Sequence, residues 1–346
     1  MTINTKKTKI MHFRGPSVER SEYVFSVCGS NIEYTETYRY LGLVLTEHLN
    51  YNITAKYVAN SATRALGLLI SKYKAFGGMP HEVFEKLYDM MVWPIISYGA
   101  AIWGAKEFSC INAVQHRAGR FFMGVGKYTP NAAVNGDMGW KPPIIRQWKA
   151  VMGHYFRCVN MDNTRLNKRV FVWSYKNRKR LRNIYLDIEN VLTTNGIDGT
   201  FNGNYIPKNR CKDMTNQLMT IMFDKYKNEL LTSINLTRGG RNKLRTYRTF
   251  KSAFVSEPYI KCNNLSRARK SALAKFRCGV TPLRIETGRF EGIPANERYC
   301  FHCVTCIENE EHVLMNCTLY DNIRQNMFVN ILNIEPDFLS LNCSEF

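Results

Sequence analysis

The sequence predicts a mainly helical protein with a small β-rich N-terminus, an α+β class, and a small Cys/His module near the C-terminal end. Short alternating segments fill the first 50 residues, apolar residues then recur every three or four positions, and four Cys/His residues cluster between 300 and 317. A chain of 346 residues exceeds the size at which one core stops growing. The expected parts are 1–50, 51–193, a linker at 194–209, 210–296, and the Cys/His module at 297–346.

The N-terminal region is expected to form a small sheet or a pair of hairpins. A short β-like segment is expected at 9–13, and apolar and polar residues alternate in 23–28, a pattern typical of half-buried strands. A Gly-Ser-Asn turn follows, and the strand pattern continues in 31–36 and 38–45.

Helical periodicity begins near residue 52 and continues over most of the chain. The apolar stripe of the first helix consists of Val58, Ala62, Ala65, Leu66, Leu69, Ile70 and Tyr73. Pro80 lies just inside the next helix, and Pro94 should kink or end it. Further helices are expected, with interruptions, at 110–125, 144–192, 211–231, 265–278 and 320–332. The Gly- and Asn-rich segment between Thr194 and Asn209 is expected to be an exposed linker.

The charge of the chain favours a polyanionic partner. It contains 48 Lys/Arg against 28 Asp/Glu, for a formal charge of +20. The excess lies in two blocks: 141–182 has twelve Lys/Arg and one acid, and 238–289 has fourteen Lys/Arg and two acids. Aromatic residues are interleaved with both, so bases could stack on exposed rings while the cations hold phosphates, although each single ring fits a core position better. The candidate nucleic-acid contacts in these blocks are Arg146, Lys149, Arg157, Lys168, Arg169, Lys176, Arg178, Lys179, Arg180, Arg241, Lys243, Arg245, Arg248, Arg267, Arg269 and Lys270.

Membrane insertion and secretion are not expected. The sequence has no run of 18 apolar residues, and its first 13 residues lack the apolar block of a signal peptide. Eleven scattered cysteines, an odd number, argue for reduced thiols rather than a disulfide framework. We therefore expect an intracellular protein, nuclear or cytoplasmic.

The Cys/His cluster predicts a structural zinc site. Cys300, Cys303, His312 and Cys317 form C-x2-C-x8-H-x4-C, which suits a closed tetrahedral site for one ion. A helix that frays near Asn316 could supply the last two ligands. Two alternatives stay open: Cys306 or His302 could replace a named ligand, or the cysteines could form a reduced, buried cluster without metal.

Several segments together resemble reverse transcriptases of non-LTR (LINE-like) retrotransposons. INTKKTKIMHF and YRYLGLVL look like the last palm segments, MMVWPIISYGAAIWG and QHRAGRFFMGV resemble the thumb and post-thumb region, and RYCFHC with EEHVLMNC is similar to the Cys/His tail. The resemblance implies a primer grip at Tyr40, Leu41 and Gly42. It also implies that Lys7 occupies the place of a lysine that assists pyrophosphate departure, with Lys6 and Lys9 close by in register. In such elements the tail binds template RNA or target DNA.

The carboxylates that polymerisation needs are not found in this sequence. The family holds two metal ions with a palm aspartate and an aspartate pair, and this chain has no adjacent aspartates. We therefore expect binding of RNA or DNA without catalysis, largely independent of sequence and strongly dependent on salt. The missing palm of a complete element is a further candidate partner. The alternative is a translated remnant of a decayed element, which has no partner and exposes apolar faces around 90–103.

Overall fold

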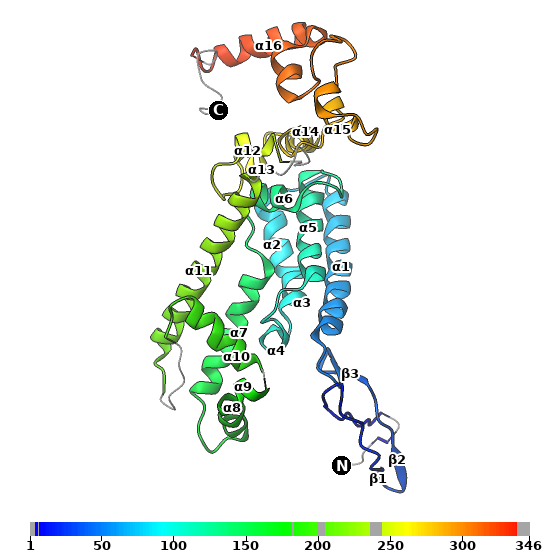
Figure 1. Ribbon diagram of the computed structural model, residues 1–346, viewed down its shortest axis with the longest axis vertical. Helices are drawn as coiled ribbons and strands as arrows, with labels where there is room; N and C mark the ends of the chain where they lie inside the picture. Colours follow the sequence, from blue (N-terminus) through cyan, green and yellow to red (C-terminus); the bar gives the residue numbers. More distant parts are fainter. Residues whose placement is uncertain (1–3, 6, 182, 199–204, 236–243, 338–346) are drawn as a thin grey trace. The chain divides into compact units, whose positions relative to one another are not determined.

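The computed structural model describes residues 4–5, 7–181, 183–198, 205–235 and 244–337. It is mostly helical with two small hairpins at the N-terminus, which confirms the predicted fold class (Figure 1). The chain forms two compact units, which interleave along the sequence. Unit 1 comprises Met1–Met79, Val83–Gln115 and Lys141–Asp224, and unit 2 comprises Pro80–Glu82, His116–Trp140 and Lys225–Phe346. The predicted linker at 194–209 falls inside the sequence range of unit 1, and residues 199–204 of it lie outside the described residues.

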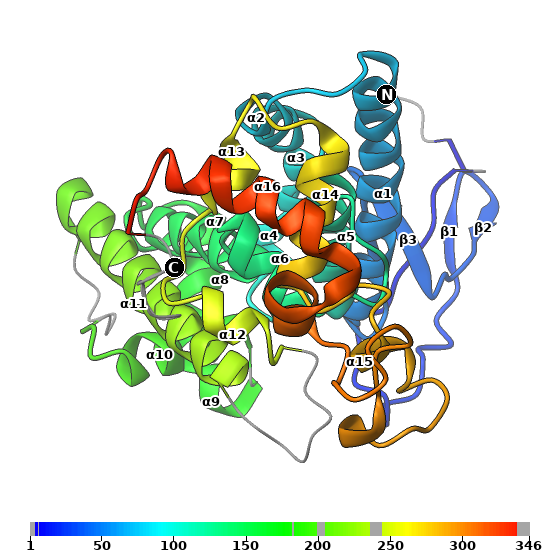
Figure 2. The same ribbon diagram turned by 90° about the horizontal axis from the view of Figure 1, so that it is seen from above.

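Unit 1 begins with two antiparallel hairpins, seen at the right in Figure 2, and the second of them contacts the first helix. Their strands are β1 (Phe25–Val27), β2 (Ser30–Ile32), β3 (Thr37–Tyr40) and β4 (Leu43–Thr46). The strand expected at 9–13 is reduced to one bridge between Ile10 and Tyr34. The segment 38–45 is not a single strand, because the chain turns at Leu41 and Gly42 with φ of 46° and 88°. Two consecutive positive φ angles are what a tight two-residue hairpin turn requires.

A buried carboxylate ties the start of the chain to the second hairpin. Glu47 accepts hydrogen bonds from Arg14 Nη2 at 3.1 Å and from Arg20 Nη2 at 2.9 Å. The hydrogen bond from Arg20 is the main cause that lowers the pKa of Glu47 below its ordinary value. The two guanidinium groups thus hold residues 14–20 against the end of β4.

Helices make up the rest of unit 1, and three of them also contain residues of unit 2. They are α1 (Tyr51–Ala75), α2 (His81–Met91), α3 (Trp93–Ser97), α4 (Ala100–Trp103), α5 (Ser109–Met123), α7 (Pro143–Val159), α8 (Leu166–Lys176), α9 (Arg178–Leu181), α10 (Ile184–Thr194) and α11 (Lys208–Asn235). The predicted stripe of α1 is confirmed, since five of its seven residues are buried and the other two are half-buried. Pro94 lies in the first turn of α3, so the helix restarts there rather than continuing from α2.

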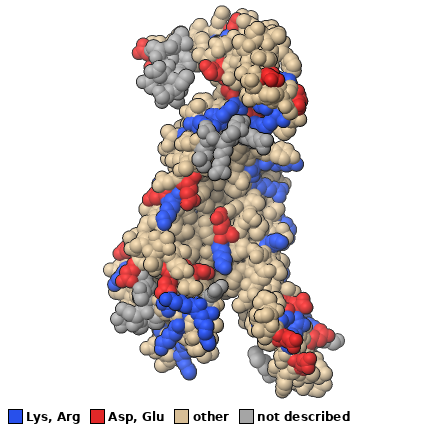
Figure 3. Space-filling view, viewed as in Figure 1, with Lys and Arg blue, Asp and Glu red and all other residues tan. Residues whose placement is uncertain are grey.

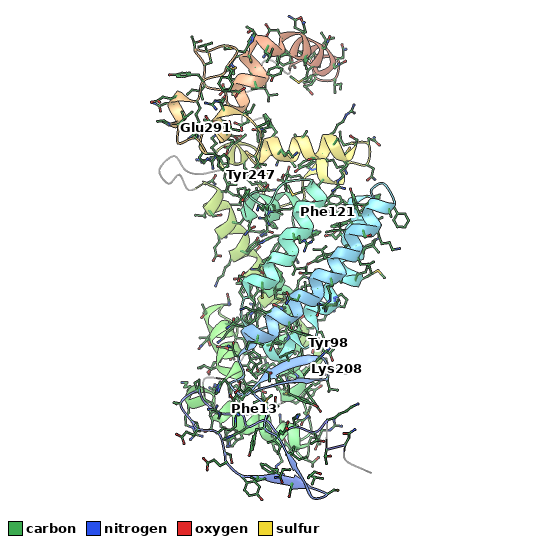
Figure 4. All side chains as sticks on the ribbon, turned by 90° about the vertical axis from the view of Figure 1, so that its right-hand side faces the viewer. Phe13, Tyr98, Phe121, Lys208, Tyr247 and Glu291 are labelled. Atoms are coloured by element: carbon green, nitrogen blue, oxygen red, sulfur yellow. The ribbon has the colours of Figure 1, made fainter. Side chains whose placement is uncertain are left out.

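The β3–β4 turn is packed against the junction of α3 and α4. Tyr98 follows α3, and its hydroxyl donates to the Leu41 carbonyl (Figure 4). Gly99, with φ of 63°, leaves no room for a side chain, because a Cβ there would lie 2.5 Å from Leu43 Cδ1. Thr54 of α1 donates to the Val44 carbonyl at 2.7 Å. The hairpin is therefore held from both sides by the helices of unit 1.

A second core in unit 1 forms among α7, α8, α10 and α11. Its buried aromatic residues are Trp148, Tyr155, Phe156, Phe171 and Tyr175, with Met214 and Leu218 contributed by α11. These rings are therefore core residues, as the sequence favoured for each single ring of the basic block. One ring of α8 is an exception.

Unit 2 contains short helices and the Cys/His module. Its elements are α6 (Asn131–Met138), α12 (Tyr247–Phe250), α13 (Pro258–Lys261), α14 (Arg267–Arg277), α15 (Arg284–Thr287), η1 (Ala295–Glu297), η2 (His312–Asn316), η3 (Thr318–Tyr320) and α16 (Asp321–Leu332). At its centre Asp137 is fully buried and binds side chains from α12, α13 and α14. Among the helices of the described residues, none has the length and apolar character needed to cross a bilayer.

Candidate metal centre and nucleic-acid interface

The predicted four ligands lie together in space. The ligand atoms of Cys300, Cys303, His312 and Cys317 are all within 4.8 Å of one another, and three of the four residues are buried. The Sγ atom of Cys317 lies 3.9 Å from that of Cys300 and 3.7 Å from that of Cys303. A tetrahedral ion with metal–sulfur bonds of about 2.3 Å holds its sulfurs about 3.8 Å apart. The separations therefore fit a shared metal ion, and they are far longer than the bond of about 2.05 Å in a disulfide.

Tight turns bring the first two cysteines to one side of the site. An antiparallel bridge pairs Tyr299 with Ile307, and the Cys300 amide donates to the Cys306 carbonyl at 2.8 Å. The Val304 amide then donates to the Cys300 carbonyl, and Val304 takes a φ of 59°. This compact loop points the two sulfurs of the C-x2-C segment in the same direction.

A single π-helical turn supplies the other two ligands. The Cys317 amide donates to the His312 carbonyl at 2.7 Å, which closes a five-residue turn over η2. Asn309 Oδ1 accepts from the His312 amide at 2.7 Å and so fixes the start of this turn. The structure thus differs from the expected frayed α-helix: a π-turn returns to the same side after five residues, which an α-turn of 3.6 residues does not.

Two buried ligand atoms of the site, His312 Nε2 and Cys317 Sγ, would be stabilised by a metal ion. Among the described residues His312 Nε2 has no hydrogen-bond partner although it is buried. Burial raises the pKa of Cys317 to about 11, whereas a backbone hydrogen bond from Thr318 is the main cause that lowers the pKa of Cys303. A cation among the ligands would satisfy the imidazole nitrogen and stabilise the buried thiolate.

The alternative ligands lie outside this group. His302 and Cys306 are both exposed, and neither belongs to the set of atoms that converge. The sequence left these alternatives open because each residue is only a few positions from a named ligand. The loop geometry assigns Cys303 rather than Cys306 to the cluster.

The implied primer-grip residues form the tip of the β3–β4 hairpin. Tyr40 and Leu41 are exposed, and Gly42 is partly covered by the Tyr98 ring. Lys7 is exposed, and its carbonyl accepts from the Tyr38 hydroxyl at 3.4 Å. The structure therefore keeps Tyr40, Leu41 and Lys7 accessible to a partner.

The first basic block divides into paired and exposed cations. Arg146 bonds Asp89 at 2.8 Å and stacks 3.7 Å above the Trp93 ring, and Arg178 makes two 2.6 Å bonds to Glu189. Lys168 is buried and donates to the Val159 carbonyl. The exposed candidates of this block are Lys149, Arg157, Arg169, Lys176, Lys179 and Arg180. Figure 3 shows Lys and Arg gathered over α8 and α9.

One aromatic side chain on α8 was absent from the predicted contacts. Trp173 is 55% exposed, and it shares the outer face of the helix with Arg169 and Lys176, four positions before and three after it. Phe171 and Tyr175 of the same helix face the core. This two-sided pattern was readable from the sequence once the helix was placed, because 171 and 175 share one face and 169, 173 and 176 share the other.

Several cations of the second basic block contact groups within unit 2. Arg245 bonds both oxygens of Glu310 at 2.7 Å and also bonds Glu286, and buried Lys270 donates to the Ile260 carbonyl at 3.1 Å. Arg267 stacks 4.6 Å from the centre of the Phe121 ring. Arg248 is half-buried and Arg269 is exposed, whereas the predicted contacts Arg241 and Lys243 lie outside the described residues.

Comparison with known proteins finds one partial similarity to a retrotransposon protein. No protein-family model and no solved structure matches the chain. Over 101 residues it is 27% identical to the putative 115 kDa protein in type-1 retrotransposable element R1DM of Drosophila melanogaster. The aligned region is 29% of this chain and 10% of that protein, so the chain spans only a small part of its relative's length.

Proposed function

We propose that this chain is a nucleic-acid-binding part of a retrotransposon-derived protein, and that a structural zinc ion folds its Cys/His module. The similarity to the retrotransposable-element protein supports the origin, and the spacing of three sulfurs and one imidazole supports the metal. A thiolate-rich closed site of this kind is typical of zinc in a structural role, with no open position for water. We assign no catalytic step to these residues, since the sequence contains no adjacent aspartates.

The observation that carries the binding proposal is the outer surface of α8 and α9. There Arg169, Lys176, Lys179 and Arg180 are exposed on the same two helices as the exposed ring of Trp173. Cations can hold successive phosphates while the indole stacks on a base, which is how proteins bind single strands with little sequence preference. Lys168, Lys270, Arg178 and Arg245 are left out of the proposed interface, because backbone carbonyls or carboxylates already bind them.

The alternative of an unpartnered remnant receives less support. It predicts exposed apolar faces in 90–103, but Val92, Ile96, Ala100 and Trp103 are all buried within unit 1. Met90, Tyr98 and Ile102 are the exposed large apolar residues of this segment, and a few such residues are ordinary for a folded domain.

Neutralising two exposed lysines is expected to reduce the salt dependence of binding. With Lys176→Gln and Lys179→Gln together, the slope of log Kobs against log salt on duplex DNA should fall by about 1.8, since each phosphate contact contributes about 0.9. Fluorescence anisotropy at several salt concentrations measures it. The matched control replaces Lys72 and Lys74, two exposed lysines in the last turn of α1 outside both basic blocks, by glutamine. An equal fall in both variants would show that only net charge matters and would contradict the proposed site.

Removing the exposed indole is expected to affect single strands selectively. Trp173→Ala should weaken binding of a single-stranded oligonucleotide by about tenfold, because stacking of one base contributes about 1–3 kcal/mol. The salt slope and the affinity for duplex should stay unchanged. Leu166→Ala, which removes another exposed apolar side chain of α8, is the control. If Trp173→Ala weakens duplex and single strand alike, the ring does not stack on bases.

A further inference from the structure

The turn that carries the last two metal ligands is held by an arginine of the following helix. Arg324 lies on α16 and is 9% exposed. Its Nε donates to the Leu314 carbonyl at 2.7 Å, and its Nη2 donates to the Cys317 carbonyl at 2.7 Å. A longer contact of 3.4 Å joins Nη2 to the Val313 carbonyl. One planar guanidinium therefore fixes three peptide groups of the turn between His312 and Cys317.

One of these peptide groups also bonds a metal ligand at its other end. The Cys317 carbonyl and the Thr318 N–H belong to the same peptide unit. The oxygen of this unit accepts from Arg324, while its N–H donates to the Cys303 sulfur and is the main cause that lowers the pKa of Cys303. Hydrogen bonds in series polarise one another, so the guanidinium strengthens the donation to this sulfur. Arg324 thus acts on Cys303 through a single peptide unit.

The buried charge of Arg324 is paired with a carboxylate at the surface. The side chain of Arg324 is 10% exposed, whereas that of its partner Asp321 is 49% exposed. Burying a cation is costly unless nearby negative charge compensates it. Three thiolates, one neutral imidazole and a divalent ion together carry one net negative charge, which an adjacent guanidinium offsets. The buried position of Arg324 is therefore most favourable when the thiolates hold a metal ion.

We propose that Arg324 is a positioning residue of the metal centre, which holds the turn from His312 to Cys317 and raises the affinity of the site for zinc. Arg324 is not itself a ligand. It fixes the carbonyls of the turn, orients the N–H that bonds Cys303, and offsets the negative charge of the thiolates. This inference rests on the proposed structural zinc site. It adds a residue seven positions beyond the last ligand, outside the Cys/His pattern.

The first test is the zinc affinity of the full chain, measured by competition with a chromophoric chelator. Arg324→Gln removes both the charge and the planar fork. Loss of an outer-shell partner weakens metal binding by about 10–100-fold, and we expect a rise in Kd of that size. Arg324→Lys keeps the charge but not the fork, so its Kd should lie between those of the wild type and Arg324→Gln.

The matched control is Arg298→Gln, which removes another carbonyl-bonded guanidinium of the same module. Arg298 donates to the carbonyls of Ile285 and Ile293, which lie outside the two segments that carry the ligands. This variant should bind zinc as tightly as the wild type. A comparable loss of affinity in both variants would mean that the arginines only stabilise the module in general, and it would overturn the proposed role.

The second test follows the thiolate of Cys303 in the zinc-loaded chain. Iodoacetamide is added at saturating zinc, and peptide mass spectrometry measures the alkylation rate of each cysteine. A thiolate that accepts a weaker hydrogen bond is more nucleophilic, so Cys303 should react severalfold faster in Arg324→Gln than in the wild type. Cys306 is exposed and outside the converging group, so it is the internal reference and its rate should not change. If Arg324→Gln does not retain zinc, Arg324→Lys serves for this measurement.

The outcomes separate this inference from the zinc site on which it rests. A wild-type chain that binds no zinc would refute the proposed site, and the role of Arg324 with it. A wild-type chain that binds one zinc ion, together with an unchanged Kd in Arg324→Gln, would overturn the role of Arg324 alone. An unchanged alkylation rate at Cys303 would contradict the link through the peptide unit between Cys317 and Thr318.

Discussion

Replacing Cys317 with serine is expected to release the metal ion and to unfold the segment from about residue 297 to the end of α16. Cys317 is fully buried, and its sulfur lies 3.9 Å from that of Cys300 and 3.7 Å from that of Cys303. Zinc binding contributes about 10–16 kcal/mol to the folding of small metal modules. Elemental mass spectrometry should therefore find close to one zinc per wild-type chain and almost none in the variant. Hydrogen exchange should increase over 297–332.

The control for this result is Cys306→Ser. That thiol is exposed and lies outside the converging group, so its variant should keep one zinc ion and the exchange pattern of the wild type.

His312→Ala tests a second ligand and should behave like Cys317→Ser. Chelation of the wild-type chain should leave the helices of unit 1 protected. Retention of one zinc ion by Cys317→Ser would refute the ligand assignment, and metal loss from Cys306→Ser would show that the loop uses a different cysteine.

The metal site was largely predictable because its ligands are close in sequence. Four residues within 18 positions can converge through local turns alone, and their spacing limits which turns serve. The choice between Cys303 and Cys306 was not predictable from spacing. It depends on the turn around Val304 and its positive φ, which a valine adopts rarely and which no sequence pattern indicates.

The helices were predictable for a different reason, and the β3–β4 turn was not. Apolar residues repeated at three and four positions in α1 because one face is buried, so burial and periodicity carry the same information. RYLGLVL appeared to be one strand because Leu41 is apolar and continues the pattern. Its carbonyl, however, accepts the Tyr98 hydroxyl, and this partner lies 57 residues away. A contact between residues so far apart in sequence can outweigh the strand propensity of the segment, and it leaves no pattern in the neighbouring residues.

Replacing Asp137 with alanine is expected to destabilise unit 2 by about 3–5 kcal/mol, the usual cost of removing one partner of a buried ion pair. Asp137 is fully buried and accepts from the hydroxyls of Tyr247 at 2.8 Å and Tyr259 at 2.6 Å. Arg277 adds contacts of 3.2 and 3.3 Å to the same carboxylate. Burial first, and then this carboxylate, raises the pKa of both tyrosines far above the ordinary value, so the phenols remain protonated donors. Urea unfolding followed by hydrogen exchange of unit 2 measures the loss.

The matched control is Glu291→Ala, which breaks an ion pair of the same unit at its surface. Glu291 bonds Arg284 at 2.8 Å, but its side chain is half exposed, so the expected cost is below about 1 kcal/mol. Figure 4 labels Glu291 and also Tyr247, one of the partners of the buried carboxylate. A similar cost for both variants would mean that Asp137 contributes no more than a surface charge. Since its partners lie 110 to 140 residues away in sequence, the Asp137 variant should raise exchange in α6 and α14 together, whereas Glu291→Ala should affect only α15 and its loop.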